Sequence, residues 1–338
     1  VMALTVLPAL KIGGMQIFRL ESGEASDKVM PRAARVTSAV TMIYLGLTAL
    51  LAVALWLEGM TGFDALIHAM TSISTGGFST SDYSLMLITT PWMQLTIMLG
   101  MIAGGLPFLA YLQLLHGQTW ALRRDPQLRW YGTLLLVGGG AVSLWLWVSY
   151  AQEPGDALRY GFFTATSIMT GTGFVVVDYN QWAGLPLAIQ FFLMFIGGCA
   201  GSTAGGIKVF RFQILLANAW VQIQRLLSPN AVLIPNYNRK PIPDHVAESV
   251  MGFLFVYTLT FTILAMALAM LGLDFITALS AAASAIGNIG PGIGQIGPLT
   301  THAGLSDPIK WLLSAGMLLG RMEMFVVLVV FTPAFWRG

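Results

Sequence analysis

Three short, glycine-rich stretches recur along this chain and constrain its fold more than any other feature. Aligned without gaps, residues 71–78 (TSISTGGF), 167–174 (SIMTGTGF) and 284–291 (SAIGNIGP) each begin with a hydroxyl side chain and carry a glycine in the seventh position. The copies are spaced by 96 and 117 residues (71 to 167, then 167 to 284), and similar hydrophobic segments surround each one. Internal repetition sets an architecture. We therefore expect a set of repeats, each built around one loop.

Composition places these repeats in a membrane. Hydrophobic residues make up 56% of the chain and charged residues only 9%, with a mean hydropathy of +0.74, whereas a soluble domain carries roughly a quarter charged residues. Apolar runs of about 20 residues indicate helical spans rather than the short alternating strands of a barrel. The fold class expected is an all-α polytopic membrane protein, in which repeated units of helix, pore helix, filter loop and helix surround a central pore.

The hydrophobic segments define the predicted domains. Single spans are expected at about 37–58, 91–115, 130–150, 247–272 and 308–335, and a longer apolar segment runs from 183 to 218. A short helix precedes each glycine-rich loop. The predicted divisions are the end of a preceding repeat with a cytosolic link (1–36), a first repeat (37–129), a second repeat with a broken second span and a link (130–243), and a third repeat (244–338).

The placement of positive charge orients the chain. Thirteen of the 17 lysines and arginines fall in the three links between repeats, at 11–35, 123–129 and 208–240. Because cytoplasmic loops of membrane proteins carry the excess of Lys and Arg, we expect the links in the cytoplasm and the glycine-rich loops facing outside. The basic residues are too scattered for a nucleic-acid site, so the expected contacts are lipids and a cytosolic partner.

The loops have the chemistry of an ion filter. Non-helical backbone is tolerated at membrane depth only where protein encloses it or it lines water, and inward-facing carbonyls can replace an ion's hydration shell. Asp64, Asp156 and Asp274 precede the short helices and are expected to cap them, which aims each negative C-terminal dipole at a loop. The alternative is that the stretches are extramembrane turns, but three copies in phase between spans favour pore loops.

The ion expected is monovalent. None of the loops contains Asp or Glu, so a carboxylate ring selective for divalent ions is disfavoured, and a neutral filter of carbonyls and hydroxyls points to K⁺ or Na⁺. The candidate filter residues, which would hold K⁺, are Ser74, Thr75, Gly76, Gly77, Thr170, Gly171, Thr172, Gly173, Gly287, Asn288, Ile289 and Gly290.

A first candidate gate lies inside the segment 183–218. At 36 residues this segment exceeds the length of one span, and five of the twelve residues 195–206 are glycine. A helix break is expected here, with a loop that blocks or opens the path below the filter; the alternative is close packing of helices through small residues. The candidate gating residues of this segment are Gly197, Gly198, Gly201, Ser202, Thr203, Gly205, Gly206 and Lys208.

A second candidate gate is Arg321, which the predicted span 308–335 places in mid-membrane. An arginine there costs at least about 2.5 kcal/mol unless it faces water or a partner. Glu323 is two residues away and points to a different face. Arg321 is therefore expected to form a positive barrier below the filter; the alternative is a side chain that snorkels to the surface.

These motifs together resemble a known family. The loops, GGCAGSTAGGIK (197–208) and GRMEM (320–324) are similar to those of the bacterial Trk/Ktr/HKT superfamily of potassium transporters, in particular its TrkH branch, and the resemblance covers essentially the whole chain. It implies four span–loop–span repeats around one K⁺ pore, gating by the loop at 197–208, an arginine at position 321, and a homodimer on a cytosolic nucleotide-binding ring similar to TrkA. It also implies weaker discrimination against Na⁺ than in a channel with four identical loops.

Only three loops occur in the sequence, and the repeat spacing predicts the missing filter before residue 1. Because three quarters of a ring cannot close a four-sided pore, we expect these 338 residues to be a truncated chain that does not form the complete pore by itself. A Na⁺-permeable or Na⁺/H⁺-coupled cation transporter is the alternative within transport. An enzyme is disfavoured, since the spans hold almost no polar catalytic groups, and no covalently bound cofactor is expected. We expect His68 to be a packing residue beside the first loop.

Overall fold

The computed structural model describes residues 33–118, 124–228, 230–231, 233–238, 240–322 and 324–337. Helices dominate these residues. The two short strands β1 (Asn236–Tyr237) and β2 (Lys240–Pro241) form an antiparallel hairpin in the predicted cytosolic link. Most of the link predicted over 1–36 lies outside the described residues, and Glu323 lies outside them too.

The first group of helices contains a bend that the hydropathy pattern hides. It comprises α4 (Ala33–Leu57), α5 (Gly62–Ile73), α6 (Pro91–Gly105) and α7 (Phe108–Leu115). The segment predicted as a single span at 91–115 is not one straight helix, because α6 and α7 meet at 94°. Pro107 has no amide hydrogen and disfavours helical geometry in the residue before it, and Leu106 is accordingly extended, with ψ of 154°.

The second group confirms the predicted break in the segment 183–218. Its elements are α9 (Pro126–Tyr150), α10 (Pro154–Met169), the 3-10 turn η1 (Tyr179–Gln181), α11 (Leu185–Ile196) and α12 (Val209–Leu227). Prolines occupy the first or second helical position of α9, α10 and α11, where a missing amide hydrogen costs nothing. Residues 197–208 between α11 and α12 are not helical.

The third group ends in short helices. It comprises α13 (Asp244–Met270), α14 (Phe275–Gly287), η2 (Gly294–Ile296), η3 (His302–Gly304), α15 (Asp307–Arg321), α16 (Met324–Val330) and α17 (Pro333–Arg337). The segment predicted as a single span at 308–335 is not one continuous helix, since α15 ends at Arg321 and α16 at Val330. Arg321 is therefore the last residue of α15 rather than the middle of a span.

Length and composition identify the membrane-crossing helices among the described residues. Three are long and apolar enough to cross: Thr37–Leu57, Pro126–Tyr150 and Asp244–Met270, and the bent pair α6–α7 makes a fourth if it is one span. The chain is a multi-pass membrane protein.

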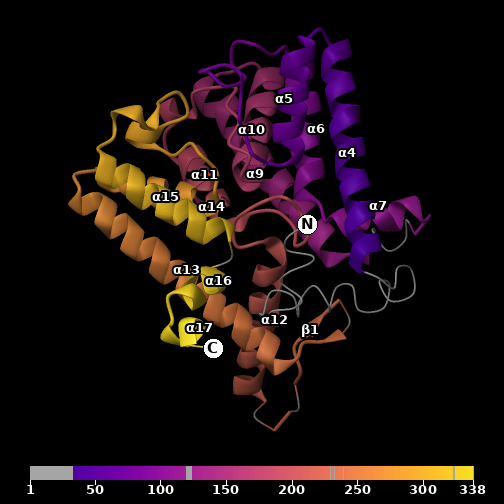
Figure 1. Ribbon diagram of the computed structural model, residues 1–338, viewed down its shortest axis with the longest axis vertical. Coiled ribbons are helices and arrows are strands. Elements are labelled where there is room, and N and C mark those ends of the chain that lie inside the picture. The colour runs from indigo at the N-terminus through magenta and orange to yellow at the C-terminus, as the bar shows by residue number, and fades with distance from the viewer. Residues whose placement is uncertain are drawn as a thin grey trace.

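The three groups pack side by side (Figure 1). The indigo and purple helices α4–α6 and the orange and yellow helices α13–α15 lie on opposite sides, with α9–α11 between them. Contacts of α10 with α6 and of α11 with α14 join the groups. α12 and the β1–β2 hairpin lie at the bottom of the view, at the opposite end from α5.

The predicted aspartate caps are correct for one helix of three. Asp274 accepts a hydrogen bond from the Thr277 amide and caps α14. α5 begins earlier than expected, so Thr61 is its cap and Asp64 lies in the first turn. α10 begins at Pro154, and Asp156 pairs instead with Arg159 at 2.6 Å.

Candidate functional site

The three glycine-rich loops follow one backbone path. Two positions in every copy have positive φ, a conformation that strongly favours glycine. The first position is Thr75 (51°), Gly171 (71°) and Asn288 (55°), and the second is Gly77 (68°), Gly173 (78°) and Gly290 (103°). Since these angles recur at aligned positions, the sequence repeat is also a repeat of conformation.

The same hydrogen bonds end each short helix. At the first positive-φ position the amide donates to the carbonyl three residues back, and the next amide donates to the carbonyl five residues back, as at left-handed helix ends. The pairs are Thr75–Ser72 (3.1 Å), Gly171–Ile168 (3.0 Å) and Asn288–Ala285 (3.1 Å), then Gly76–Thr71 (2.8 Å), Thr172–Ser167 (3.0 Å) and Ile289–Ser284 (3.0 Å). Local bonding thus fixes the loop entry.

The hydroxyl that opens each stretch closes two of the loops. Thr71 Oγ1 donates to the Phe78 carbonyl at 2.9 Å, and Ser167 Oγ donates to the Phe174 carbonyl at 2.7 Å. In the third stretch the buried Ser284 Oγ has no hydrogen-bond partner among the described residues. The third loop therefore needs other contacts to hold its far end.

The loops lie directly against one another in chain order. A Cβ on Gly77 would overlap the carbonyl oxygen of Thr172, and one on Gly173 would overlap the carbonyl oxygen of Ile289. The structure therefore brings together candidate filter residues that are about a hundred positions apart in sequence. Ser74 and Thr170 are the C-terminal caps of α5 and α10, and Gly287 is the last residue of α14.

The site is neutral and rich in oxygen atoms. The second loop is the most enclosed, with Thr170 at 0% and Thr172 at 1% exposure. Within the described part of the chain there is no group of three or more His, Cys, Asp or Glu side chains that could hold a metal ion. Backbone carbonyls and hydroxyls are the available ligands, and they suit a monovalent cation.

Thr203 anchors the break between α11 and α12 beneath the first loop. Its Oγ1 donates to the carbonyls of Ile73 (2.8 Å) and Gly104 (3.0 Å). Thr75 Oγ1, from the first loop, donates to Thr203 Oγ1 at 3.3 Å. The segment 197–208 is thus in direct contact with the glycine-rich loops.

This break and the α6–α7 bend satisfy each other's backbone groups. The Cys199 amide donates to the Gly105 carbonyl, and the Phe108 amide donates to the Gly201 carbonyl, each at 3.0 Å. Interrupted helices in a membrane need such partners for their freed polar groups. Sequence reasoning missed the bend, although Pro107, two residues after the Gly104–Gly105 pair, was the available signal.

The two ends of the break close on one another. The Lys208 amide donates to the Ile196 carbonyl at 2.8 Å, and Lys208 itself has a φ of 75°. A Cβ on Gly197 would overlap the Gly205 carbonyl, and one on Gly206 would lie 2.9 Å from Gly197 Cα. Ser202 Oγ donates within the segment to the Cys199 carbonyl at 2.6 Å. The glycines here permit the close approach of the two backbone segments at the ends of the break.

Arg321 touches this same segment. Its Nη1 donates to the Thr203 carbonyl at 3.3 Å, and its side chain is otherwise exposed. The preceding Gly320 allows the approach, since a Cβ there would overlap the Ile286 carbonyl at the end of α14. The two candidate gates, inferred separately from sequence, are therefore in contact.

His68 is a packing residue, as expected. It is fully buried; its Nδ1 lies 2.7 Å from the Asp64 carbonyl and its Nε2 lies 3.0 Å from Ser79 Oγ.

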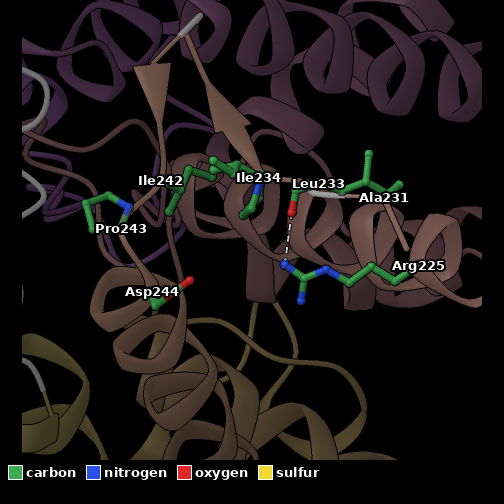
Figure 2. Close-up of a pocket in the computed structure, with 8 residues that line it drawn as sticks. Arg225, Ala231, Leu233, Ile234, Ile242, Pro243 and Asp244 are labelled. Carbon is green, nitrogen blue, oxygen red and sulfur yellow. Dashed lines mark hydrogen bonds between the residues drawn. The ribbon is translucent and has the colours of Figure 1, made fainter. Parts of the chain in front are cut away.

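A pocket of about 450 Å³ lies far from the loops, between the end of α12 and the start of α13. Figure 2 shows Arg225 reaching across it to donate to the Leu233 carbonyl at 2.9 Å. Asp244 lines the opposite side.

Membrane-crossing helices that enclose neutral, oxygen-rich loops define a membrane transport protein. The chain belongs to the TrkH family of cation transport proteins, which its residues 1–337 match. Because this is a family of transporters, the expectation that the chain is not an enzyme is confirmed, as is the resemblance drawn from the motifs.

Similar proteins cover the whole chain. The Trk system potassium uptake protein TrkI of Halomonas elongata is 43% identical over all of this chain and 69% of its own length. The Trk system potassium uptake protein TrkH of Escherichia coli K12 is 35% identical over all of this chain and 70% of its own length. The crystal structure of the potassium transporter TrkH from Vibrio parahaemolyticus matches 99% of this chain and 69% of that one, with 32% identity and a TM-score of 0.87.

Proposed function

We propose that this chain takes part in potassium uptake, with K⁺ passing between the glycine-rich loops. The observation that carries the proposal is the repeated left-handed geometry of three loops that lie against one another in chain order. Backbone carbonyls brought together in this way can replace the hydration shell of an ion. The names of the similar proteins, Trk system potassium uptake proteins, support K⁺ as the cargo.

Electrostatics favours a monovalent cation at these loops. Each of α5, α10 and α14 ends where its loop begins, and a helix C-terminus carries a partial negative charge of about half a unit. No carboxylate lies among the loop residues, so a divalent ion would lack counter-charge. The filter oxygens we propose are those of 74–77, 170–173 and 287–290.

The proposed architecture extends this site to the whole chain. The divisions 37–129, 130–243 and 244–338 are repeats around a central pore, with loops facing outside and links in the cytoplasm of an inner membrane. The protein is a homodimer on a cytosolic nucleotide-binding ring similar to TrkA. In this orientation the β1–β2 hairpin and the pocket beside Arg225 face the cytoplasm, where such a ring would dock.

The segment 197–208 and Arg321 form the proposed gate. Support comes from the hydrogen bonds of Thr203 to both the first loop and Arg321. In the closed state the segment blocks the path beneath the loops, and the guanidinium adds a positive charge that repels K⁺.

Ion flux into liposomes tests the proposed function. The purified protein is reconstituted, and uptake of radioactive Rb⁺ is measured while external K⁺ or Na⁺ competes; protein-free liposomes are the control. We expect K⁺ to compete at several-fold lower concentration than Na⁺. Equal competition would replace the proposal with a Na⁺-permeable pathway, uptake that requires a Na⁺ or proton gradient would indicate coupled transport, and uptake equal to that of empty liposomes would contradict transport.

A further inference from the structure

Beyond its loop, each repeat continues into a segment that bonds to the neighbouring repeat, and one side chain dominates the second of these contacts. Asn180 Nδ2 donates to the Gly294 carbonyl at 3.0 Å, and the Gly294 amide donates to Asn180 Oδ1 at 2.8 Å. One carboxamide thus satisfies both backbone groups of one residue. This paired bonding fixes distance and orientation together, since both atoms must align at once.

The surroundings of this amide leave room for nothing larger than glycine. A Cβ on Gly297 would lie 2.9 Å from Asn180 Nδ2, and a Cβ on Gly294 would overlap Thr277 Oγ1. Gly294 also has a φ of 80°. The half-buried Asn180 side chain therefore lies in a close-fitting cradle formed by Gly294 and Gly297, and its contact there is more than a loose surface contact.

The cradle is rigidly joined to α14, the helix that leads into the third loop. Ser280 Oγ accepts from the Ile293 amide and donates to the Ile293 carbonyl, both at 2.9 Å. The Gln295 amide donates to Thr277 Oγ1 at 3.0 Å, and both hydroxyl side chains are fully buried. A displacement of Gly294 would therefore also displace α14, which leads into the loop 284–291.

The corresponding contact between the first and second loops depends less on a side chain. There the Leu85 amide donates to the Val175 carbonyl at 3.0 Å, and the Val175 amide donates to Ser84 Oγ at 3.1 Å. Half of that contact is backbone and survives any substitution. Among the described residues, the one further bond between the second and third loops runs from the Tyr179 hydroxyl to the Gly292 carbonyl, at 3.3 Å.

The third loop depends on this contact because its own closure is missing. Ser284 Oγ lacks the bond to the loop end that Thr71 and Ser167 make in the other copies. The loop end is instead held through residues 292–297, by Ser280 of its own helix and by Asn180 of the second repeat. The Ile289 carbonyl lies against Gly173, so the spacing between these two segments bears directly on the place of this carbonyl.

We propose that Asn180 is a positioning residue for ion selectivity, which holds the third loop at a fixed spacing from the second. This inference rests on the proposed K⁺ pathway. K⁺ and Na⁺ carry the same charge and differ in size, so loops free to approach one another accommodate the smaller ion better. Asn180 touches no ion itself; it acts through Gly294 and α14.

Two matched pairs of variants test the proposal in the reconstituted full-length protein. Asn180→Ala removes both bonds to Gly294, and Asn180→Asp keeps the shape but replaces the amide donor with an acceptor. Gln181 is the control, because its neighbouring carboxamide is exposed and bonds only within its own turn, to Asp178 Oδ2 at 3.0 Å. Gln181→Ala repeats the loss of a carboxamide and Gln181→Glu repeats the added negative charge, and neither changes a bond to Gly294.

The readout is the ratio of K⁺ to Na⁺ competition in the Rb⁺ uptake assay. We expect a drop of about three- to ten-fold in both Asn180 variants and no change in the Gln181 variants. A surface charge concentrates both cations alike, so the ratio reports geometry. The inference is overturned if Asn180→Ala keeps the wild-type ratio of K⁺ to Na⁺ competition. If the alanine variant does not assemble, the same outcome in Asn180→Asp overturns it. An equal drop of this ratio in the Gln181 variants also overturns it. A wild type without K⁺ preference contradicts the proposed function instead.

Discussion

The glycine-rich loops and the break between α11 and α12 are both non-helical backbone inside a helical bundle, but they are held in different ways. Each loop is entered through bonds to its own short helix, three and five residues back. The break closes on itself through the Lys208 amide and the Ile196 carbonyl, but it is also tied to distant elements. Thr203 bonds to Ile73 and Gly104, and Cys199 bonds to Gly105. Local bonds make a frame that survives motion of its neighbours, whereas distant bonds can be released without unfolding a helix. This difference supports the proposal that the loops select the ion and that the break moves.

The largest expected effect is the loss of loop geometry in Gly173→Ala. Gly173 has positive φ, and a Cβ would overlap the Ile289 carbonyl. The conformation alone costs about 1–2 kcal/mol for a residue with a side chain, and the overlap forces two loops apart. We expect Rb⁺ uptake to fall at least about a hundred-fold.

The matched control for this variant is Gly140→Ala in α9, where a Cβ meets nothing within 4 Å. Its uptake should equal that of the wild type. Near-normal uptake by Gly173→Ala in protein that assembles normally would show that the loop frame does not line the ion path.

These loops could be predicted because they are local features. The hydroxyl, the glycines and the spacing lie within eight residues, and the left-handed positions fall where the alignment puts them. The break after Ile196 was equally visible as a cluster of glycines. Glycine marks the second left-handed position in every copy, so residue type reports the backbone freedom there directly. At the first position only the second copy has glycine, since the other two have Thr75 and Asn288.

The features that sequence reasoning missed are tertiary. Hydropathy continues across Pro107 and past Arg321, so two bent or broken segments were predicted as single spans. The predictions that Asp64 and Asp156 cap their helices were wrong because α5 already begins at Gly62 and α10 at Pro154. No pattern in the sequence pairs Asn180 with Gly294, 114 residues away.

The next effect concerns the charge held against the break. Arg321→Ala removes a positive charge and the bond to the Thr203 carbonyl. A charge near an ion path at an effective dielectric constant of about 20 acts with about 1–2 kcal/mol, so uptake should rise about ten-fold. Arg225→Ala is the control, because it too loses one guanidinium bond to a carbonyl, that of Leu233. Unchanged uptake in Arg321→Ala would remove this side chain from the gate.

A smaller gain is expected from Thr203→Val, which keeps the shape of the side chain and removes the hydroxyl. The bonds to Ile73, Gly104 and Thr75 are lost together. A net loss of about 1 kcal/mol would shift a closed–open equilibrium, and with it uptake, about five-fold towards open. Thr262→Val is the control, since its hydroxyl bonds only to Thr258 within its own helix. Reduced uptake in Thr203→Val would assign the break to the frame and not to the gate.

The smallest effect should be confined to stability, at the capped start of α14. Asp274→Ala removes the bond to the Thr277 amide and the contact with Gln295, and loss of such a cap costs about 1 kcal/mol. Hydrogen bonding with the Thr277 side chain and then with its amide holds the pKa of Asp274 below its usual value. The stabilisation is therefore complete above the ordinary pKa of an aspartate and is lost as pH falls through the lowered value. The thermal unfolding temperatures of wild type and variant should differ at neutral pH and converge in acid.

The control is Asp307→Ala, at an exposed ion pair with Lys310, which should give a smaller difference in unfolding temperature. A gap between wild type and Asp274→Ala that persists unchanged in acid would show that the carboxylate does not act as the cap.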